Sequence, residues 1–87
     1  MTSAIVVFSS STTANRLKRL ASAEQLRGVG LIQAPRALSQ NGCTYALRFP
    51  AEVLTPLLSL AERYQVNHGQ VYLELLDKEG RKFYRQY

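Results

Sequence analysis

Several features that mark membrane, disulfide-linked and metal-binding proteins are missing from this sequence, which has one cysteine, one histidine and no long hydrophobic run. A membrane-spanning helix needs roughly 18 consecutive apolar residues. The first apolar stretch, residues 4–8, is too short for the core of a signal peptide and has no basic segment before it. One cysteine excludes an internal disulfide, and one cysteine with one histidine cannot complete a zinc site. We therefore expect a cytoplasmic protein without a membrane segment, metal or other cofactor.

The patterns of common catalytic sites are also missing. There is no P-loop, no Gly-x-Gly-x-x-Gly stretch and no Ser-His-Asp arrangement around a glycine-flanked nucleophile. His68 lies in "VNHGQV", which is typical of a polar turn between a helix and a strand. No two carboxylates form a suggestive acid–base pair; the acidic residues are Glu24, Glu52, Glu62, Glu74, Asp77 and Glu79. The sequence therefore predicts that the protein is not an enzyme.

What is present is an ordinary globular composition. The chain has 87 residues, of which 46% are hydrophobic and 20% charged, and this suits one domain over residues 1–87. We expect a core at about residues 4–76 and a basic hairpin or tail at 77–87, with no internal repeat. The formal charge of +5 favours solubility, and it also suits an acidic partner.

Hydrophobic periodicity predicts strands at 4–8, 29–34, 43–49 and 70–76, with a hairpin loop at 77–80 and a fifth strand at 81–86. A first helix is predicted at about 12–27, ended by Gly28. A second helical pattern opens at Pro50 and ends at residues 67–69, with Pro56 either as its first helical residue behind Thr55 or as a kink. The order predicts an α+β, ferredoxin-like βαββαβ fold, with two helices on one face of an antiparallel sheet and a C-terminal β-hairpin extension.

The segment "QAPRALSQNGCTYALRF", residues 33–49, holds the only cysteine. Pro35 ends a strand, and Asn41-Gly42 predicts a turn because both residues tolerate positive φ. Alternation places Cys43 on the same side of its strand as the apolar residues that follow, which favours a small buried residue. Its position at the start of the strand, beside a loop, favours an accessible thiol. The residues alone leave both interpretations open.

A working thiol has to form a thiolate, although a free cysteine is mostly protonated at neutral pH. Arg36 lies on the loop seven residues upstream, and its charge would stabilise the anion. Amides of the Asn41-Gly42 turn would do the same. Arg48 is predicted to face the other side of the strand, too far away to help.

The stretch "GVGLIQAPRALSQNGCTYALRF" resembles the signature of a family of small bacterial selenium/sulfur carrier-like proteins, a domain of unknown function. The matching features are an aliphatic strand, the pair Pro35-Arg36, a short polar loop, Cys43, and an apolar strand ending at residues 46–49. The resemblance covers about residues 4–76. Thr44 stands where the family usually has glycine.

The resemblance implies a carrier that holds sulfur or selenium on Cys43 as a persulfide or selenosulfide. Its partners would be proteins that donate the cargo and proteins that accept it. On this hypothesis Arg36 stabilises the anion, and the loop shapes access to the thiol through Pro35, Ser39, Asn41 and Gly42.

Two other functions fit parts of the sequence. The first is a small dimeric binding or assembly module with an incidental cysteine, in which the helix-free face pairs with a second copy and carries Val6, Ile32, Ala46 or Tyr72. The second is nucleic-acid binding, because "NGCTYALRF" loosely resembles the third strand of RNA-recognition domains. Cys43 replaces a stacking aromatic there, so the pattern does not favour nucleic acid as a partner.

Overall fold

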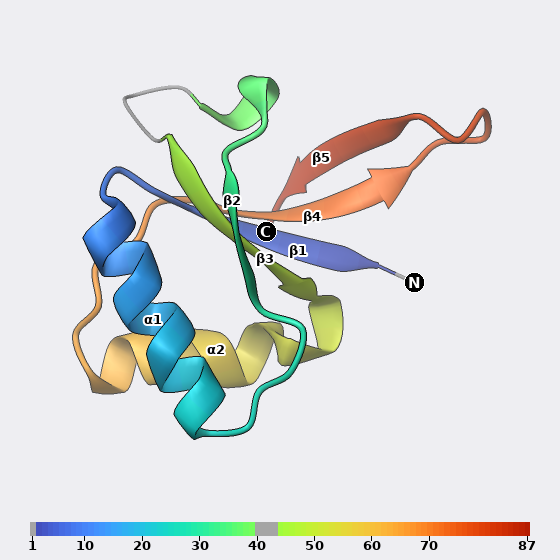
Figure 1. Cartoon of the computed structure of the whole chain (residues 1–87). Coiled ribbons are helices and arrows are strands. Elements are labelled where there is room, and N and C mark those ends of the chain that lie inside the picture. Colours follow the sequence, from blue (N-terminus) through green and yellow to red (C-terminus); the bar gives the residue numbers. More distant parts are fainter. Residues whose placement is uncertain (1, 40–43) are drawn as a thin grey trace.

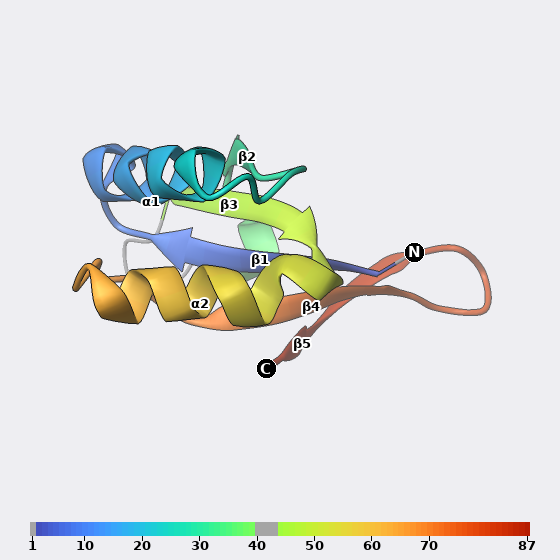
Figure 2. The same cartoon turned by 90° about the horizontal axis from the view of Figure 1, so that it is seen from below.

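Within residues 2–39 and 44–87, which the structure describes, the chain forms a five-stranded antiparallel sheet with two helices packed on one face (Figures 1 and 2). The structure is a computed structural model. Its elements are β1 (Ser3–Phe8), α1 (Ser11–Ala23), β2 (Gly30–Gln33), the 3-10 turn η1 (Arg36–Leu38), β3 (Tyr45–Pro50), the 3-10 turn η3 (Ala51–Val53), α2 (Leu54–Arg63), β4 (Val71–Leu76) and β5 (Lys82–Gln86).

The strands lie in the order β2-β3-β1-β4-β5, and every neighbouring pair is antiparallel. This confirms the predicted α+β class, with its antiparallel sheet and two helices. The order differs from that of a four-stranded ferredoxin-like sheet because β5 is added beside β4. The ferredoxin-like topology therefore stays a prediction.

β1 lies at the centre of the sheet, between β3 and β4. Its residues Ala4, Val6 and Phe8 pack in the cluster that contains both helices, whereas Ile5 and Val7 pack in a second cluster on the opposite face. All five are buried. A strand covered on both faces reads as a continuous apolar run, which explains the "AIVVF" sequence.

The helix-covered face holds the larger core. Leu17 of α1 and Leu57 of α2 are both 0% exposed, and they pack in one cluster with Leu47 and Phe49 of β3. In Figure 2 both helices lie in front of the sheet, on the same side of it. The predicted alternation of β3 is confirmed for the described residues, because Ala46 packs on the opposite face.

The opposite face is covered by short elements instead of helices. Leu38 of η1 packs against Ile5, Val7 and Ala46, and the hairpin residues Tyr72 and Tyr84 pack beside this cluster, which Ile32 also joins. The prediction that Val6 belongs to this face is wrong. Val6 points toward the helices, because its register in β1 is that of Ala4 and Phe8.

α1 ends four residues earlier than predicted, at Ala23. Gln25 adopts φ 61°, and the N–H of Leu26 donates to the carbonyl oxygen of Ala21 over 2.8 Å. This closing bond of a Schellman-type turn stops the helix before Gly28. Gly28 has φ 84° in the next turn, where a Cβ would lie 2.9 Å from Cδ of Pro50. Glycine is therefore needed at this position because the loop passes close to Pro50, and not because the helix ends there.

α2 ends in the same way, at Arg63 and not at residues 67–69. Gln65 has φ 54°, and the N–H of Val66 donates to the carbonyl oxygen of Ala61 over 2.8 Å. The two ends read "LASAEQL" (20–26) and "LAERYQV" (60–66). This local repeat is a signal for both helix ends that the predicted bounds did not use. Pro56 is the third residue of α2 and not the first helical residue behind Thr55, so that alternative is wrong, while the predicted kink stays a prediction. Proline is tolerated there because first-turn amides have no partner within the helix.

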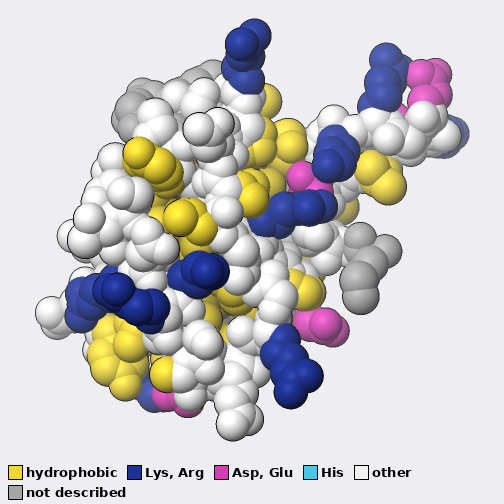
Figure 3. Space-filling model, viewed as in Figure 1, with side chains coloured by type: hydrophobic (Ala, Val, Ile, Leu, Met, Phe, Trp, Pro, Cys, Tyr) yellow, Lys and Arg dark blue, Asp and Glu magenta, His cyan; other side chains and the backbone are white. Residues whose placement is uncertain are grey.

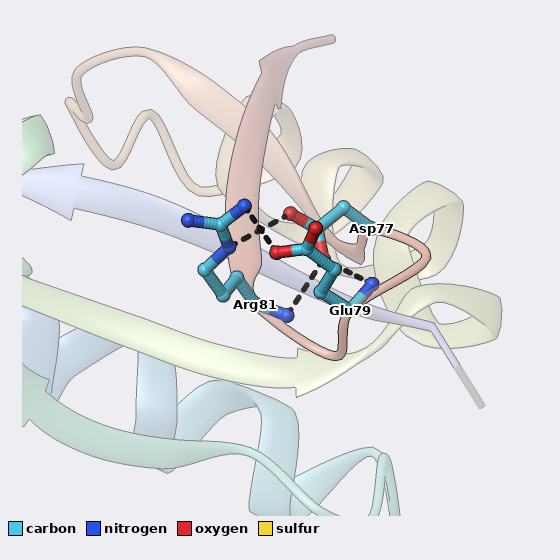
Figure 4. Close-up of polar contacts among 3 residues, drawn as sticks. All are labelled: Asp77, Glu79 and Arg81. Atoms are coloured by element: carbon cyan, nitrogen blue, oxygen red, sulfur yellow. Dashed lines mark hydrogen bonds and ion pairs between the residues drawn. The ribbon is translucent and has the colours of Figure 1, made fainter.

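β4 and β5 form the predicted hairpin extension (Figure 1). Its turn is organised by Asp77, whose Oδ1 accepts hydrogen bonds from the backbone N–H groups of Glu79 and Arg81 (Figure 4). The Arg81 side chain lies against the carboxylates of Asp77 and Glu79. Gly80 supplies the positive φ, 81°, that the turn requires.

In the described part of the chain, neither helix has the length and apolar character of a bilayer-spanning segment.

Candidate functional site

The candidate site lies where the chain leaves β2 and enters β3. Cys43, Asn41 and Gly42 are outside the described residues, so the Asn-Gly turn and the exposure of the thiol stay predictions. The residues on either side are described. Ser39 follows η1, and Thr44, the neighbour of Cys43 in sequence, precedes β3.

The upstream side of the site is held by η1. Pro35, with φ −54° and ψ 147°, turns the chain out of the strand direction, and its carbonyl accepts a hydrogen bond of 2.8 Å from the N–H of Leu38. Leu38 is only 7% exposed and anchors the turn on the sheet. Ser39 Oγ donates to the carbonyl oxygen of Arg36 over 3.0 Å. Pro35 and Ser39 therefore both take part in the hydrogen bonds that hold η1, and their role in shaping access to the thiol stays a prediction.

Arg36 is exposed on η1 and forms no ion pair within the described residues. Because Leu38 is buried, the turn fixes the backbone that carries Arg36 while its guanidinium stays in solvent. A cation in this setting is available for an anion. The distance from Arg36 to the thiol lies outside what the structure describes.

The downstream side of the site is fixed by the sheet. The carbonyl oxygen of Thr44 accepts a hydrogen bond of 3.0 Å from the N–H of Ala34, and Tyr45 pairs with both Gln33 and Phe8. A shallow depression of about 290 Å³ is lined by Gln33, Ala34, Ser39, Thr44 and Tyr45. Both described neighbours of the 40–43 segment, Ser39 and Thr44, thus border one small cavity at the edge of the sheet.

α1 begins at this end of the sheet. β1 ends at Phe8, opposite Tyr45, and Ser10 caps the helix by accepting a bond from the N–H of Thr13 over 3.5 Å. The first turn of α1 carries no acidic residue. The positive end of the helix dipole favours an anion nearby. The segment "SSSTT" (residues 9–13) was not among the predicted site residues; its place directly after an apolar strand was the signal that it borders the site.

His68 also lies at this end of the sheet. Gly69 N–H donates to the carbonyl of Val7 over 2.7 Å, which places the β4 approach beside the end of β1. His68 is exposed, and its Nδ1 is 2.7 Å from the carbonyl oxygen of Gly69. This agrees with a polar turn residue.

Arg48 lies elsewhere. Its guanidinium Nη2 is 2.7 Å from Oε1 of Glu74, whose side chain is only 8% exposed, and Tyr84 donates to Oε2 of Glu74 over 3.4 Å. Burial, then the charge and hydrogen bond of Glu74, raise the pKa of Tyr84, and Arg48 lowers it by a smaller amount. This cluster lies on the helix-free face of the sheet. Arg48 therefore points away from the apolar side of β3, as the sequence predicted.

A metal site finds no support in this geometry. Among the residues that the structure describes, no group of three or more His, Cys, Asp or Glu side chains lies close enough to bind one ion.

The fold and the site together define a small α+β domain whose single cysteine falls, in the sequence, between β2 and β3. The chain belongs to the family described as "Putative Se/S carrier protein-like", which it matches over residues 3–73. This range includes the cysteine segment and confirms the family resemblance seen in the sequence. No curated protein and no solved structure matches the chain.

Proposed function

We propose that this protein is a carrier of sulfur or selenium and that Cys43 holds the cargo. The observation that supports this most strongly is the combination of family membership over residues 3–73 with a single cysteine in the whole sequence. A carrier needs a nucleophile that forms a reversible bond to sulfur or selenium, and the cysteine thiolate has that chemistry. In this chain only Cys43 supplies it.

The carrier step is a sulfur transfer between thiols. The Cys43 thiolate attacks the terminal sulfur of a donor protein's persulfide, a new S–S bond forms, and the donor's S–S bond breaks. The donor cysteine leaves as a thiolate, so no external oxidant or reductant is needed. Selenium from a donor selenosulfide follows the same exchange. An acceptor protein reverses the step, and the protein itself remains a carrier and not an enzyme.

Two surroundings of the site favour a thiolate. Arg36 carries an exposed cation on η1 without an ion-pair partner among the described residues. α1 begins at the same end of the sheet, with no acid in its first turn. Cations and helix N-termini both lower the pKa of a thiol. A location in the bacterial cytoplasm, where thiols are kept reduced, suits this chemistry.

We also infer that β1 to β4 with α1 and α2 form a ferredoxin-like unit. Its support is that β1 stands between β3 and β4, and β2 lies outside β3, as in a split βαβ arrangement. In that description β5 is an added edge strand.

The experiment is intact-mass analysis after incubation with a persulfide donor. The wild-type protein should gain the mass of one sulfur atom, and reductant should remove it. Cys43→Ser should gain nothing. An unmodified wild-type protein would instead favour the alternative, a dimeric binding module with an incidental cysteine. Sedimentation of the same sample would then show whether two copies associate.

The role of Arg36 is tested by the rate of transfer. Arg36→Gln should slow adduct formation several-fold at neutral pH and much less at alkaline pH, where the thiol ionises without help. Arg85→Gln on β5 removes the same charge from an exposed position and is the matched control. Equal slowing in both variants would assign the effect to net charge and reject a local role for Arg36.

A further inference from the structure

A broad depression lies at the other end of β2 from the cysteine segment. Its volume is about 690 Å³, and its walls are α1 and the loop that follows this helix. The polar and charged residues that line it are Asn15, Lys18, Arg19, Ser22, Gln25 and Arg27. The carrier chemistry proposed above makes no use of it.

The charge of this depression is of one sign. Lys18, Arg19 and Arg27 line it, and no carboxylate does. None of these three cations forms an ion pair in the described ranges. Glu24, which follows the last residue of α1, pairs with Arg63 instead, with 3.8 Å between Glu24 Oε1 and Arg63 Nη1. Figure 3 shows basic side chains lying over α1. Neighbouring cations that lack counter-charges on the protein attract anions from solution.

The backbone of the loop adds hydrogen-bond donors. The backbone N–H groups of Arg27 and Gly28 donate no hydrogen bond in the described part of the chain, and both residues line the depression. The positive φ of Gly28 and its close approach to Pro50 fix the path of the loop. Consecutive N–H groups beside a residue with positive φ are a common anion-binding arrangement.

The end of α1 would ordinarily oppose an anion, because a helix C-terminus carries partial negative charge. Here the last carbonyls are already occupied. Those of Leu20, Ala21 and Ser22 accept hydrogen bonds from the N–H groups of residues 24, 26 and 25. The turn that ends the helix at Ala23 therefore also masks its negative end.

We propose that this depression binds a condensed phosphate, that is, a diphosphate or triphosphate group, free or carried by a nucleotide. Its volume falls within the range of about 300–1,000 Å³ typical of small-molecule sites. Its lining combines cations and hydrogen-bond donors with the apolar side chains of Leu26 and Val29. Two arginines supply the planar forks that bind phosphate oxygens in pairs, and three cations match a ligand of several negative charges.

The test is an NMR titration of the full chain with pyrophosphate, a nucleoside triphosphate and orthophosphate as separate probes. Saturable shifts should centre on the amides of residues 15–29, and pyrophosphate should bind more tightly than orthophosphate. A nucleotide that binds as tightly as pyrophosphate, or more tightly, extends the site to nucleotides. Weaker nucleotide binding leaves free condensed phosphate as the ligand.

Two triple variants separate a local site from net charge. K18Q/R19Q/R27Q should lose at least about tenfold in pyrophosphate affinity. K78Q/K82Q/R85Q removes the same charge from the hairpin and should bind like the wild type. Equal weakening in both variants would overturn the proposal. So would shifts spread over the whole surface, or binding of an acidic peptide but not of pyrophosphate. Cys43→Ser should bind pyrophosphate normally, so this result is independent of the carrier test.

Discussion

The two faces of the sheet are covered in different ways. One face packs against both helices and buries large apolar side chains of the strands, of α1 and of α2. The other is covered by η1 and by the hairpin tyrosines, and it includes the polar cluster of Arg48, Glu74 and Tyr84. The comparison indicates that stability resides mainly on the helix-covered face. The helix-free face carries η1, the turn that holds Arg36, so residues of this face border the candidate site.

The largest effect should separate the two faces directly. Leu57→Ala on the helix-covered face should lower the free energy of unfolding by about 3–4 kcal/mol, whereas Leu38→Ala on the other face should cost about 2 kcal/mol, because η1 can settle onto the sheet more easily than a helix can. Urea unfolding followed by circular dichroism measures both. Equal losses would contradict the division of the core drawn here.

A smaller effect is expected from the polar cluster. Arg48→Met leaves the nearly buried carboxylate of Glu74 with only the Tyr84 hydroxyl as partner, and should cost about 1–2 kcal/mol. Adding Glu74→Met should recover most of this loss, because no unpaired charge then remains. The double-mutant cycle in urea measures the coupling. A double variant as unstable as the sum of the singles would show that the two side chains act independently.

The helix ends offer changes that stabilise the protein. Gln25 and Gln65 both hold positive φ, which glycine adopts without a steric penalty. Gln25→Gly and Gln65→Gly should each raise the free energy of unfolding by up to about 1 kcal/mol. Gln25→Ala keeps the Cβ and is the control, expected to give no such gain. The thermal midpoints of the three variants report the outcome, and a loss in the glycine variants would contradict the assigned turn.

The smallest effect concerns alkaline pH. The pKa of Tyr84 is raised from its usual 10.0, so the folded state holds this proton more tightly than the unfolded state does. Its contribution to stability is complete below pH 10 and is lost as the pH rises through the folded-state pKa. Tyr84→Phe should make stability fall less steeply above pH 10 in urea titrations. Identical slopes for both proteins would exclude a raised pKa.

Much of the fold followed from local pattern. The five strands and two helices have the predicted order, because alternation, apolar runs and turn residues are local properties of the chain. The helix ends could not be predicted from local pattern. A glycine was expected to end the first helix, whereas Gln25 and Gln65 are the residues that adopt the left-handed conformation. An apolar residue after each glutamine, bonded back to a buried alanine, decides these ends.

The candidate site was predicted only in part. The segment from Pro35 to Thr44 and the cation at Arg36 came from sequence and family resemblance. The positions of the α1 N-terminus and of His68 at this end of the sheet could not be predicted from sequence. The pairing of β1 with β3 and β4 brings them there. Residues far apart in sequence meet through such pairing, and no local pattern records it.

The sequence by itself determined the class of the fold, the family and the single cysteine on which the proposed carrier role rests, because these depend on residue type and local periodicity. The tertiary structure alone decided which apolar residues face the helices, where each helix stops, and that Lys18, Arg19 and Arg27 surround one depression. Strand register and packing fix those relations, and both arise from contacts between distant segments.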